Sequence, residues 1–171
     1  MPDDGAVVVL IGAPGAGKTR TGRRIAAKLE VPFIDTDKRI VAMHGPIVDI
    51  FTAYGEPHFR AIERGVVAEA LTEKAVVALG GGAVVDEQTQ RALEGHRIVQ
   101  LTVDAAAVER RISVGKRPLV KGIESWKQIV ASRQHIYDRL AGITIDTSRR
   151  PLGGVADEIV DWVRSDEHGK R

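Results

Sequence analysis

The residues with the plainest chemistry form a glycine-rich stretch near the start of the chain. The segment GAPGAGKT, residues 12–19, matches the pattern G-x-x-x-x-G-K-[ST] and follows an apolar run. Its glycines let the backbone curl so that several N–H groups point at one anion, which the dipole of a following helix also favours. A glycine-rich turn before an amphipathic helix is the plainer alternative, but such a turn does not require Gly-Lys-Thr at these offsets. We therefore predict a nucleoside triphosphate site made by Gly12, Ala13, Pro14, Gly15, Ala16, Gly17, Lys18 and Thr19.

Within this site, two side chains have distinct expected roles. Lys18 is expected to reach the β- and γ-phosphates, and the Thr19 hydroxyl is expected to bind Mg²⁺. The loop alone does not say which group receives the phosphoryl, because switches, motors and kinases all use it.

Two aspartates are expected at the same edge of the fold as this loop. Asp35 and Asp37, in VPFIDTD, follow a short apolar run that is typical of a strand. Ligands of an open parallel sheet bind beyond the carboxyl ends of its strands. If the segment stays extended, carboxylates at i and i+2 point the same way and can serve a metal ion and an acceptor hydroxyl. The alternative is that one of them only caps a helix starting near Lys38.

The rest of the chain narrows the class of nucleotide-binding protein. A GTPase reads its base with an asparagine-containing motif, and the chain contains no asparagine. Motor ATPases carry an acidic pair at the end of an apolar strand, whereas the run at residues 76–82 ends in three glycines. Asp104 is a competing acidic candidate, but we interpret it as the cap of the helix that follows it.

A second group of residues suits an anionic acceptor. Arg60 and Glu63, in GEPHFRAIE, are one helical turn apart, which indicates either a surface ion pair or an arginine turned inward toward a ligand. The planar fork of arginine donates two parallel hydrogen bonds to a carboxylate. The three glycines Gly80, Gly81 and Gly82 would let backbone N–H groups approach that ligand, unless they form only a tight turn.

Two further arginines are candidates on less evidence. The segment SVGKRPLVKG, residues 113–122, is basic and contains glycine and proline, as mobile lids do, although an ordinary exposed loop has the same composition. Arg117 in this segment could cover the phosphates. Arg133 lies on a predicted helix whose core face carries Ile129, Ile136 and Leu140, so it is either a ligand-binding residue or a surface arginine with a buried stem.

Short apolar runs alternate with stretches of helical spacing, which predicts an α/β fold with a parallel sheet covered on both faces. The expected strands are residues 6–11, 31–34, 75–79, 97–103 and 143–145, and the expected helices are residues 18–29, 59–71, 87–93, 105–112, 125–140 and 155–163. A length of 171 residues favours one domain.

Composition excludes several classes of protein. The net charge of +2 is too balanced to indicate nucleic-acid binding, and the absence of cysteine excludes a disulfide scaffold. The start MPDD lacks the pattern of a signal peptide, and no apolar run is long enough to span a membrane. We therefore expect a cytoplasmic protein with no membrane or nucleic-acid partner.

Taken in order, these motifs resemble the shikimate kinase family almost from end to end. The matching segments are GAPGAGKT, DTD, GPIVDIF, GEPHFRAIE, LGGGAV, RPL, the pair Arg133–Tyr137, and IDTSRRP. The phosphate-binding loop is common to many folds, but DTD, FRxIE and GGG at these separations are specific to the family.

The resemblance implies a three-layer fold of the nucleoside-monophosphate-kinase type, with a five-stranded parallel sheet, a substrate-binding region near residues 36–64 and a lid near residues 113–124. The reaction it implies is the transfer of the γ-phosphoryl group of ATP to the 3-hydroxyl of shikimate with Mg²⁺, in aromatic amino-acid (chorismate) biosynthesis. It also implies a monomer whose partners are the small molecules shikimate and ATP.

The resemblance also implies roles for individual residues. Asp37 would bind the shikimate hydroxyls, and Asp35 would support magnesium with Thr19. Arg60, oriented by Glu63, and Arg133 would hold the carboxylate, and Lys18, Asp37 and Arg117 would be the catalytic group. Further members would be the acceptor-pocket residues Phe51, Phe59, Gly80, Gly81 and Gly82, and the nucleotide-binding residues Arg111, Arg117, Arg150 and Pro151.

Two alternatives remain at this point. One is another small-molecule kinase of the same fold, such as a gluconate kinase, which would lack the paired Arg60 and Arg133 around the three glycines. The other is a module that binds a nucleotide without catalysis, although every expected catalytic position is filled.

Overall fold

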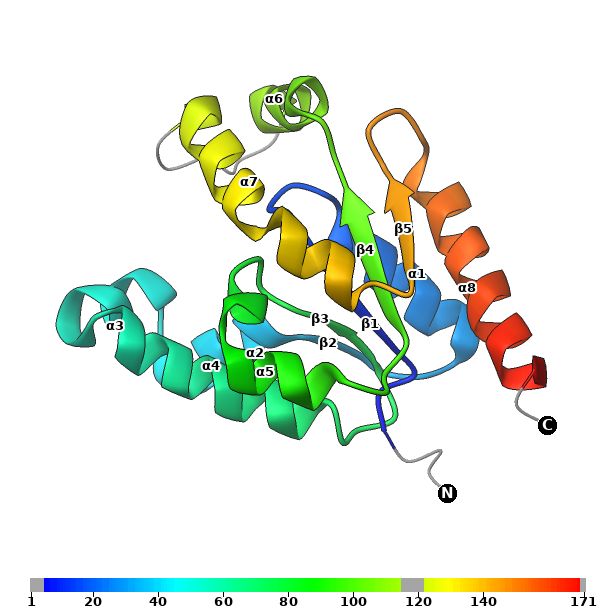
Figure 1. Ribbon diagram of the computed structural model, residues 1–171, viewed down its shortest axis with the longest axis horizontal. Coiled ribbons are helices and arrows are strands. Elements are labelled where there is room, and N and C mark those ends of the chain that lie inside the picture. Colours follow the sequence, from blue (N-terminus) through cyan, green and yellow to red (C-terminus); the bar gives the residue numbers. More distant parts are fainter. Residues whose placement is uncertain (1–4, 115–121, 170–171) are drawn as a thin grey trace.

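A five-stranded parallel sheet forms the centre of the molecule (Figure 1). The computed structural model describes residues 5–114 and 122–169. The strands are β1 (Val8–Gly12), β2 (Phe33–Asp35), β3 (Val76–Ala78), β4 (Ile98–Thr102) and β5 (Ile143–Asp146), in the spatial order β2-β3-β1-β4-β5. Every neighbouring pair is parallel. The order reverses on either side of β1, so the loop after β1 opens where an α/β sheet binds ligands.

Helices cover both faces of this sheet. They are α1 (Lys18–Leu29), α2 (Thr36–His44), α3 (Ile47–Tyr54), α4 (Glu56–Ala70), α5 (Glu87–Leu93), α6 (Ala105–Val114), α7 (Gly122–Leu140) and α8 (Leu152–Gly169), with a short 3₁₀ turn η1 (Ala83–Val85). None of the helices in the described ranges is both long and apolar enough to cross a bilayer.

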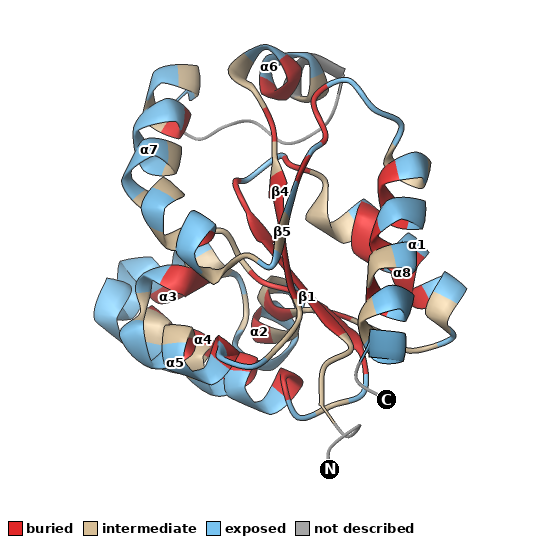
Figure 2. Ribbon diagram, turned by 45° about the vertical axis from the view of Figure 1, so that its right-hand side comes forward, coloured by how far each residue is buried: buried red, intermediate tan, exposed pale blue. Residues whose placement is uncertain are grey.

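The alternation of side chains along β1 explains the two layers. Val8 and Leu10 belong to a core cluster with residues of α1 and α8, whereas Val9 and Ile11 belong to a cluster with residues of α4, α5 and α7. Successive side chains of a strand point to opposite faces, so a continuous apolar run buries both. Figure 2 shows this as buried strands between helices whose inner faces are buried. The predicted three-layer α/β fold is confirmed.

The predicted bounds were accurate for some elements and wrong for others. The helices expected at 18–29 and 87–93 have those bounds. The strands at β3 and β4 are shorter than predicted, α4 begins at Glu56 rather than residue 59, and α8 runs well beyond residues 155–163 at both ends. Ile129 is 39% exposed, so the core face predicted for α7 was wrong at that position, and Trp126 and Tyr137 are the buried residues of that helix.

The region of residues 36–64 is a helical subassembly with its own small core. Helices α2, α3 and α4 pack together around Ile40, Ile50, Phe59 and Val66. Figure 1 shows α3 at the far end of the molecule from α8. This small core fixes the start of α4, which carries Arg60.

The predicted lid is described only at its ends. Helix α6 reaches Val114 and α7 begins at Gly122, so residues 122–124 belong to a helix. The intervening residues, including Arg117, lie outside the described ranges, and the roles given to Arg117 stay predictions.

Candidate active site

The loop between β1 and α1 has the backbone that its glycines predict. Gly12, Gly15 and Gly17 all have positive φ angles, which L side chains rarely adopt. At Gly12 an added Cβ would also collide with the carbonyl oxygen of Leu101 on β4. Lys18 Nζ donates to the carbonyl oxygens of Gly12 at 2.6 Å and Ala13 at 3.1 Å. The Lys18 side chain thus folds over the start of the loop in which a triphosphate would bind.

Burial lowers the pKa of Lys18 to about 8, while the negative charges of Asp37 and Asp35 oppose that fall. The site therefore concentrates one ammonium and two carboxylates. An anion placed in the loop would favour the charged form of Lys18.

Thr19 and Asp35 come together as predicted for a metal pair. The Thr19 hydroxyl donates to Asp35 Oδ2 at 3.0 Å, while Asp35 Oδ1 accepts the backbone N–H of Lys38 at 3.2 Å. Asp35 therefore caps α2 and faces Thr19 at once, so capping does not exclude the metal role. The predicted extended geometry was wrong, because α2 begins at Thr36 and places Asp37 in its first turn.

The donor set of this pair fits Mg²⁺. A hydroxyl and a carboxylate are hard oxygen ligands, and Mg²⁺ is usually held by one or two such groups together with water and substrate phosphates. No group of three or more His, Cys, Asp or Glu residues suited to a metal occurs within residues 5–114 and 122–169. Water and substrate phosphates would supply the remaining ligands.

Asp37 faces the glycine segment after β3. A Cβ added to Gly80 would lie 2.9 Å from Asp37 Oδ2, so only glycine leaves room for the carboxylate there. Gly80 N–H also donates to the Thr36 hydroxyl at 3.3 Å, which ties the segment to the start of α2. The predicted proximity of Asp37 and Gly80 is present in the structure.

Arg60 is held by a buried carboxylate. Its guanidinium donates from Nη1 to Glu63 Oε1 at 2.6 Å, and the Glu63 side chain is 3% exposed. Burial raises the pKa of Glu63, and the hydrogen bond from Arg60 opposes the rise. A buried acid-base pair of this kind is not the exposed surface pair of the alternative interpretation, and it fixes the position of the arginine.

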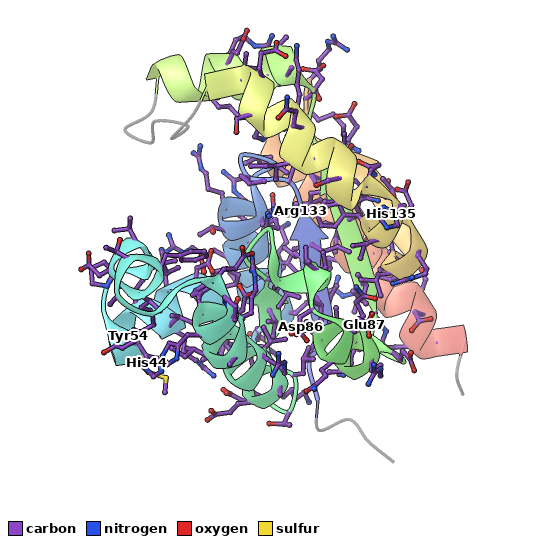
Figure 3. The ribbon with its side chains drawn as sticks, turned by 60° about the vertical axis from the view of Figure 1, so that its left-hand side comes forward. His44, Tyr54, Asp86, Glu87, Arg133 and His135 are labelled. Carbon is purple, nitrogen blue, oxygen red and sulfur yellow. The ribbon has the colours of Figure 1, made fainter. Side chains whose placement is uncertain are left out.

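Arg60 and Arg133 converge on Gly82. A Cβ added to Gly82 would lie 2.5 Å from Arg60 Nη2 and 3.0 Å from Arg133 Nη2. Figure 3 shows Arg133 and His135 on opposite sides of α7, with Arg133 toward the interior of the molecule. Arg133 is half-buried, and two guanidinium groups from α4 and α7 meet at one glycine. This arrangement can bind a carboxylate.

The two phenylalanines predicted as pocket walls contact each other. The rings of Phe51 and Phe59 are 4.8 Å apart, and the Arg60 guanidinium lies 5.3 Å from the centre of the Phe59 ring. Phe59 is buried in the small core, whereas Phe51 is 36% exposed. The Phe59 ring thus packs against the Arg60 guanidinium. The role of Phe51 as a pocket wall stays a prediction.

The nucleotide-edge residues divide into two groups. Arg111 donates to Gly15 O at 2.6 Å and to Thr147 O at 2.6 Å, so it joins the phosphate-binding loop to the loop after β5. Arg150 instead pairs with Glu158 of α8 at 2.7 Å, and Pro151 immediately precedes α8. Asp104 Oδ1 accepts the N–H of Ala107, which confirms it as the cap of α6.

Sequence reasoning missed Thr147. Its buried hydroxyl donates to Ala16 O at 2.9 Å and Thr102 O at 3.0 Å, and so joins the phosphate-binding loop to the ends of β4 and β5. The segment IDTSRRP contains this threonine, but its bonds could not be predicted, since its partners lie far away in sequence. Arg64 was also missed, and it makes a close ion pair with Asp86 beside the glycine segment.

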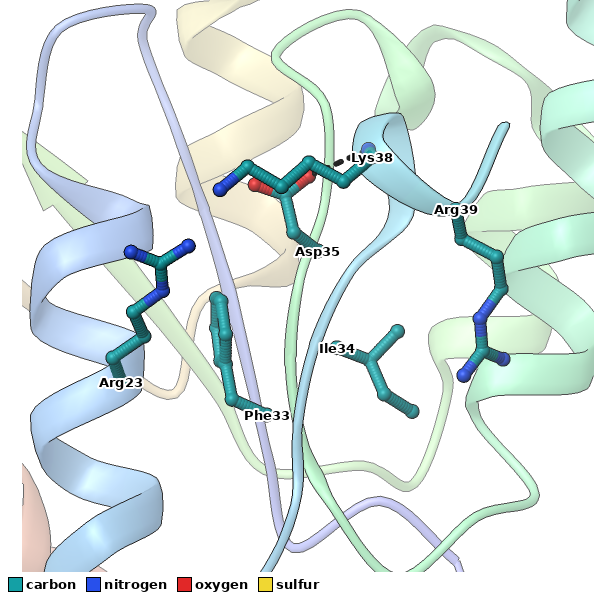
Figure 4. A pocket seen from close by; sticks show the side chains of 6 residues that line it. All are labelled: Arg23, Phe33, Ile34, Asp35, Lys38 and Arg39. Atoms are coloured by element: carbon teal, nitrogen blue, oxygen red, sulfur yellow. Dashed lines mark hydrogen bonds between the residues drawn. The ribbon is translucent and has the colours of Figure 1, made fainter. Parts of the chain in front are cut away.

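A hollow beside the metal pair is lined by Arg23, Phe33, Ile34, Asp35, Lys38 and Arg39 (Figure 4). It contains neither the acceptor arginines nor the glycine segment. Three of its six lining residues are cations, two of which (Arg23 and Lys38) are exposed, so we do not equate the hollow with the acceptor pocket.

Comparisons with known proteins all point to one family. A family model described as shikimate kinase matches residues 14–164. The shikimate kinase of Thermobifida fusca (strain YX) is 48% identical over 147 residues, which cover 83% of this chain and 86% of that protein. That of Mycobacterium avium (strain 104) is 45% identical over 158 residues, covering 89% and 90%. The solved structure of shikimate kinase from Acinetobacter baumannii in complex with shikimate has a TM-score of 0.85 at 30% identity, covering 95% of this chain and 94% of that chain.

Proposed function

The chain belongs to the shikimate kinase family, and we propose that its site transfers the γ-phosphoryl group of ATP to the 3-hydroxyl of shikimate, with Mg²⁺ as the metal ion. The chain is a phosphotransferase of that family. The observation that carries it is the convergence of Arg60 and Arg133 on Gly82, beside Asp37 and the phosphate-binding loop.

The acceptor is positioned by charge complementarity. Shikimate has one carboxylate and three hydroxyls, and the two guanidinium groups supply planar donors for that carboxylate. Because Glu63 already holds Arg60, little side-chain entropy is lost when the carboxylate binds. The carboxylate of Asp37, which lies beside Gly80, accepts a hydrogen bond from the acceptor hydroxyl. This bond orients the hydroxyl oxygen of the acceptor.

The donor is positioned by the phosphate-binding loop. Its backbone N–H groups and the N-terminus of α1 hold the phosphate chain, and Lys18 leaves its carbonyl partners to donate to the β- and γ-phosphates. Transfer of a phosphoryl group depends mainly on placing the two oxygens in line and stabilising charge, so no covalent protein intermediate is required.

Thr19 and Asp35 would hold the metal ion. When bound, Mg²⁺ neutralises charge that develops on the phosphate oxygens. Asp35 keeps its second oxygen on the N–H of Lys38, so its orientation is fixed by the start of α2. Arg111, which already contacts Gly15, would border the nucleotide.

The remaining parts of the proposal depend on the resemblance to the family. They are a lid carrying Arg117, nucleotide contacts from Arg150 and Pro151, pocket contacts from Phe51, a monomeric state and a cytoplasmic location. A lid would keep water from competing with the acceptor hydroxyl.

A coupled assay of ADP release tests the proposed function. Shikimate should support turnover, and gluconate should not, because the chain belongs to the shikimate kinase family. The matched variant Lys18→Ala should be inactive with either acceptor. Turnover with gluconate alone, or ATP binding without transfer to shikimate, would contradict the proposal.

A further inference from the structure

Helix α7 contacts both substrate loops with residues on one of its faces. Trp126, Arg133 and Tyr137 are spaced i, i+7 and i+11, so they lie along one stripe of the helix. Trp126 is 6% exposed and Tyr137 is 1% exposed. Arg133, between them, is the residue proposed above for the acceptor carboxylate.

Trp126 is bonded to the tip of the phosphate-binding loop. Its indole Nε1–H donates to Pro14 O at 2.8 Å, although the two residues are 112 positions apart in the sequence. The ring packs in the core cluster that contains Ala13 and Ala16 of the same loop. A buried indole N–H needs an acceptor, so this bond constrains where the loop tip and α7 lie relative to each other.

Tyr137 is bonded to the acceptor segment. Its hydroxyl donates to Gly81 O at 2.6 Å. Burial raises the pKa of Tyr137, and the neighbouring Arg133 guanidinium opposes this rise, so the hydroxyl stays protonated and remains a donor at neutral pH. Tyr137 therefore fixes Gly81 and lies beside the arginine one turn before it.

The two loops also approach each other directly. A Cβ added to Gly81 would lie 3.2 Å from both Cγ and Cδ of Pro14, tighter than an ordinary contact. These contacts form a closed ring. Pro14 is bonded to Trp126 on α7, and the same helix carries Arg133 and Tyr137. Tyr137 is bonded to Gly81, which in turn lies against Pro14. A movement of Pro14 should therefore also move α7 and Gly81.

We propose that Trp126 is a positioning residue that couples occupancy of the phosphate-binding loop to the carboxylate-binding position of Arg133. A nucleotide that orders the loop fixes the Pro14 carbonyl, and the rigid indole passes this constraint to α7. Arg133 lies about 10 Å further along the helix, at 1.5 Å per residue over seven residues. Nucleotide binding then strengthens acceptor binding, and by thermodynamic linkage acceptor binding strengthens nucleotide binding by the same factor. This inference rests on the proposed acceptor role of Arg133.

If Trp126 only fills the core, its replacement by Phe should lower the free energy of unfolding and leave the linkage between the two ligands unchanged. If it couples the loops, the linkage itself should fall. The ratio of shikimate dissociation constants without and with nucleotide separates these cases, because a general loss of stability does not alter that ratio.

The experiment is isothermal titration of shikimate into the full chain, with and without saturating ADP and Mg²⁺. In the unchanged protein, ADP should tighten shikimate binding by at least about fivefold, the lower end of common coupling. Trp126→Phe should keep shikimate affinity without ADP within about twofold and reduce the tightening by about 2- to 5-fold, the value of one weak hydrogen bond. Trp162→Phe, which changes the other tryptophan on α8, should leave the tightening unaltered.

Tyr137→Phe supplies a second test if Trp126→Phe fails to fold. It removes the bond to Gly81 on the other side of the closed ring of contacts, and it should also reduce the tightening. Absence of any tightening in the unchanged protein, or the full tightening in both variants, would overturn the inference. Absence of shikimate binding in every protein would instead contradict the proposed function.

Discussion

Gly82 offers a sharp test of the acceptor pocket, because its replacement by Ala adds one methyl group between two arginines. The backbone of Gly82, with φ of −95° and ψ of −3°, is open to any residue, so alanine brings no backbone strain. The added carbon would lie 2.5 Å from Arg60 Nη2, whereas an ordinary contact begins at 3.4 Å. The guanidinium must therefore move by about 0.9 Å, the difference between these distances.

That displacement should affect binding more than folding. Guanidinium tips end flexible side chains, so the free energy of unfolding should change by less than about 1 kcal/mol. Misplacement of a positioning group by about 1 Å can reduce the rate by about 100-fold. We therefore expect kcat/KM for shikimate to fall by about 100-fold, while the dissociation constant of ATP changes by less than about threefold.

The assay is steady-state ADP release with shikimate varied, together with thermal unfolding and ATP titration. Gly65→Ala is the matched control, since a Cβ at that position of α4 meets nothing within 4 Å. It should retain kcat/KM and unfold at an equal or higher temperature. A Gly82→Ala variant with near-normal shikimate kinetics would refute the convergence of Arg60 and Arg133 on this glycine as the acceptor site.

Three further predictions follow from the same geometry. Arg133→Ala should weaken shikimate binding by about 10- to 100-fold in titration, the loss of a charge-assisted hydrogen bond, with ATP binding retained; wild-type affinity would remove Arg133 from the site. Asp37→Asn should lower kcat by at least about 100-fold while shikimate still binds, and near-normal turnover would remove Asp37 from the acceptor hydroxyl. The pKa of Lys18 is lowered to about 8 in the free protein, and a bound phosphate should raise it again. At pH 8 about half of the Lys18 side chains are neutral, so ATP binding should take up about 0.5 proton. At pH 6 Lys18 is already charged, so it should take up none. Titrations in buffers of different ionisation enthalpy measure this uptake, and equal uptake by Lys18→Met would contradict the assignment.

The sheet and the phosphate-binding loop were predictable because their signals are local. The loop after the apolar run depends on the backbone freedom of Gly12, Gly15 and Gly17, which the sequence shows directly. The structure has the expected positive φ angles at all three. The helix expected from residue 18 to 29 likewise follows from its own periodicity. Such elements depend little on what packs against them.

The acceptor site was harder to predict from residue types alone. For Arg133, sequence periodicity could not separate a surface arginine from a ligand-binding one, because the distinction depends on Gly82 and Tyr137 from other elements. The order of the motifs, through the family resemblance, favoured the ligand-binding interpretation, which stays a prediction. The extended geometry of Asp35 and Asp37 was wrong because Asp35 itself starts α2 by capping it.

Thr147 and the bond of Trp126 to Pro14 could not be derived from sequence. Each is a contact between segments more than 100 residues apart, and no spacing in the sequence points to the partner. A tryptophan seven residues before Arg133 was the available signal, since that spacing puts both on one helix face.

In the proposed reaction, the phosphoryl group moves from ATP to the 3-hydroxyl of an acceptor held by Arg60 and Arg133. The most direct measurement is a two-dimensional ¹H–³¹P correlation spectrum of the product formed from shikimate, ATP and Mg²⁺. A phosphate ester coupled to the hydrogen on carbon 3 should form, and Arg133→Ala should form it about 10- to 100-fold more slowly at limiting shikimate. An ester at another hydroxyl, or release of inorganic phosphate without any ester, would contradict the proposed reaction.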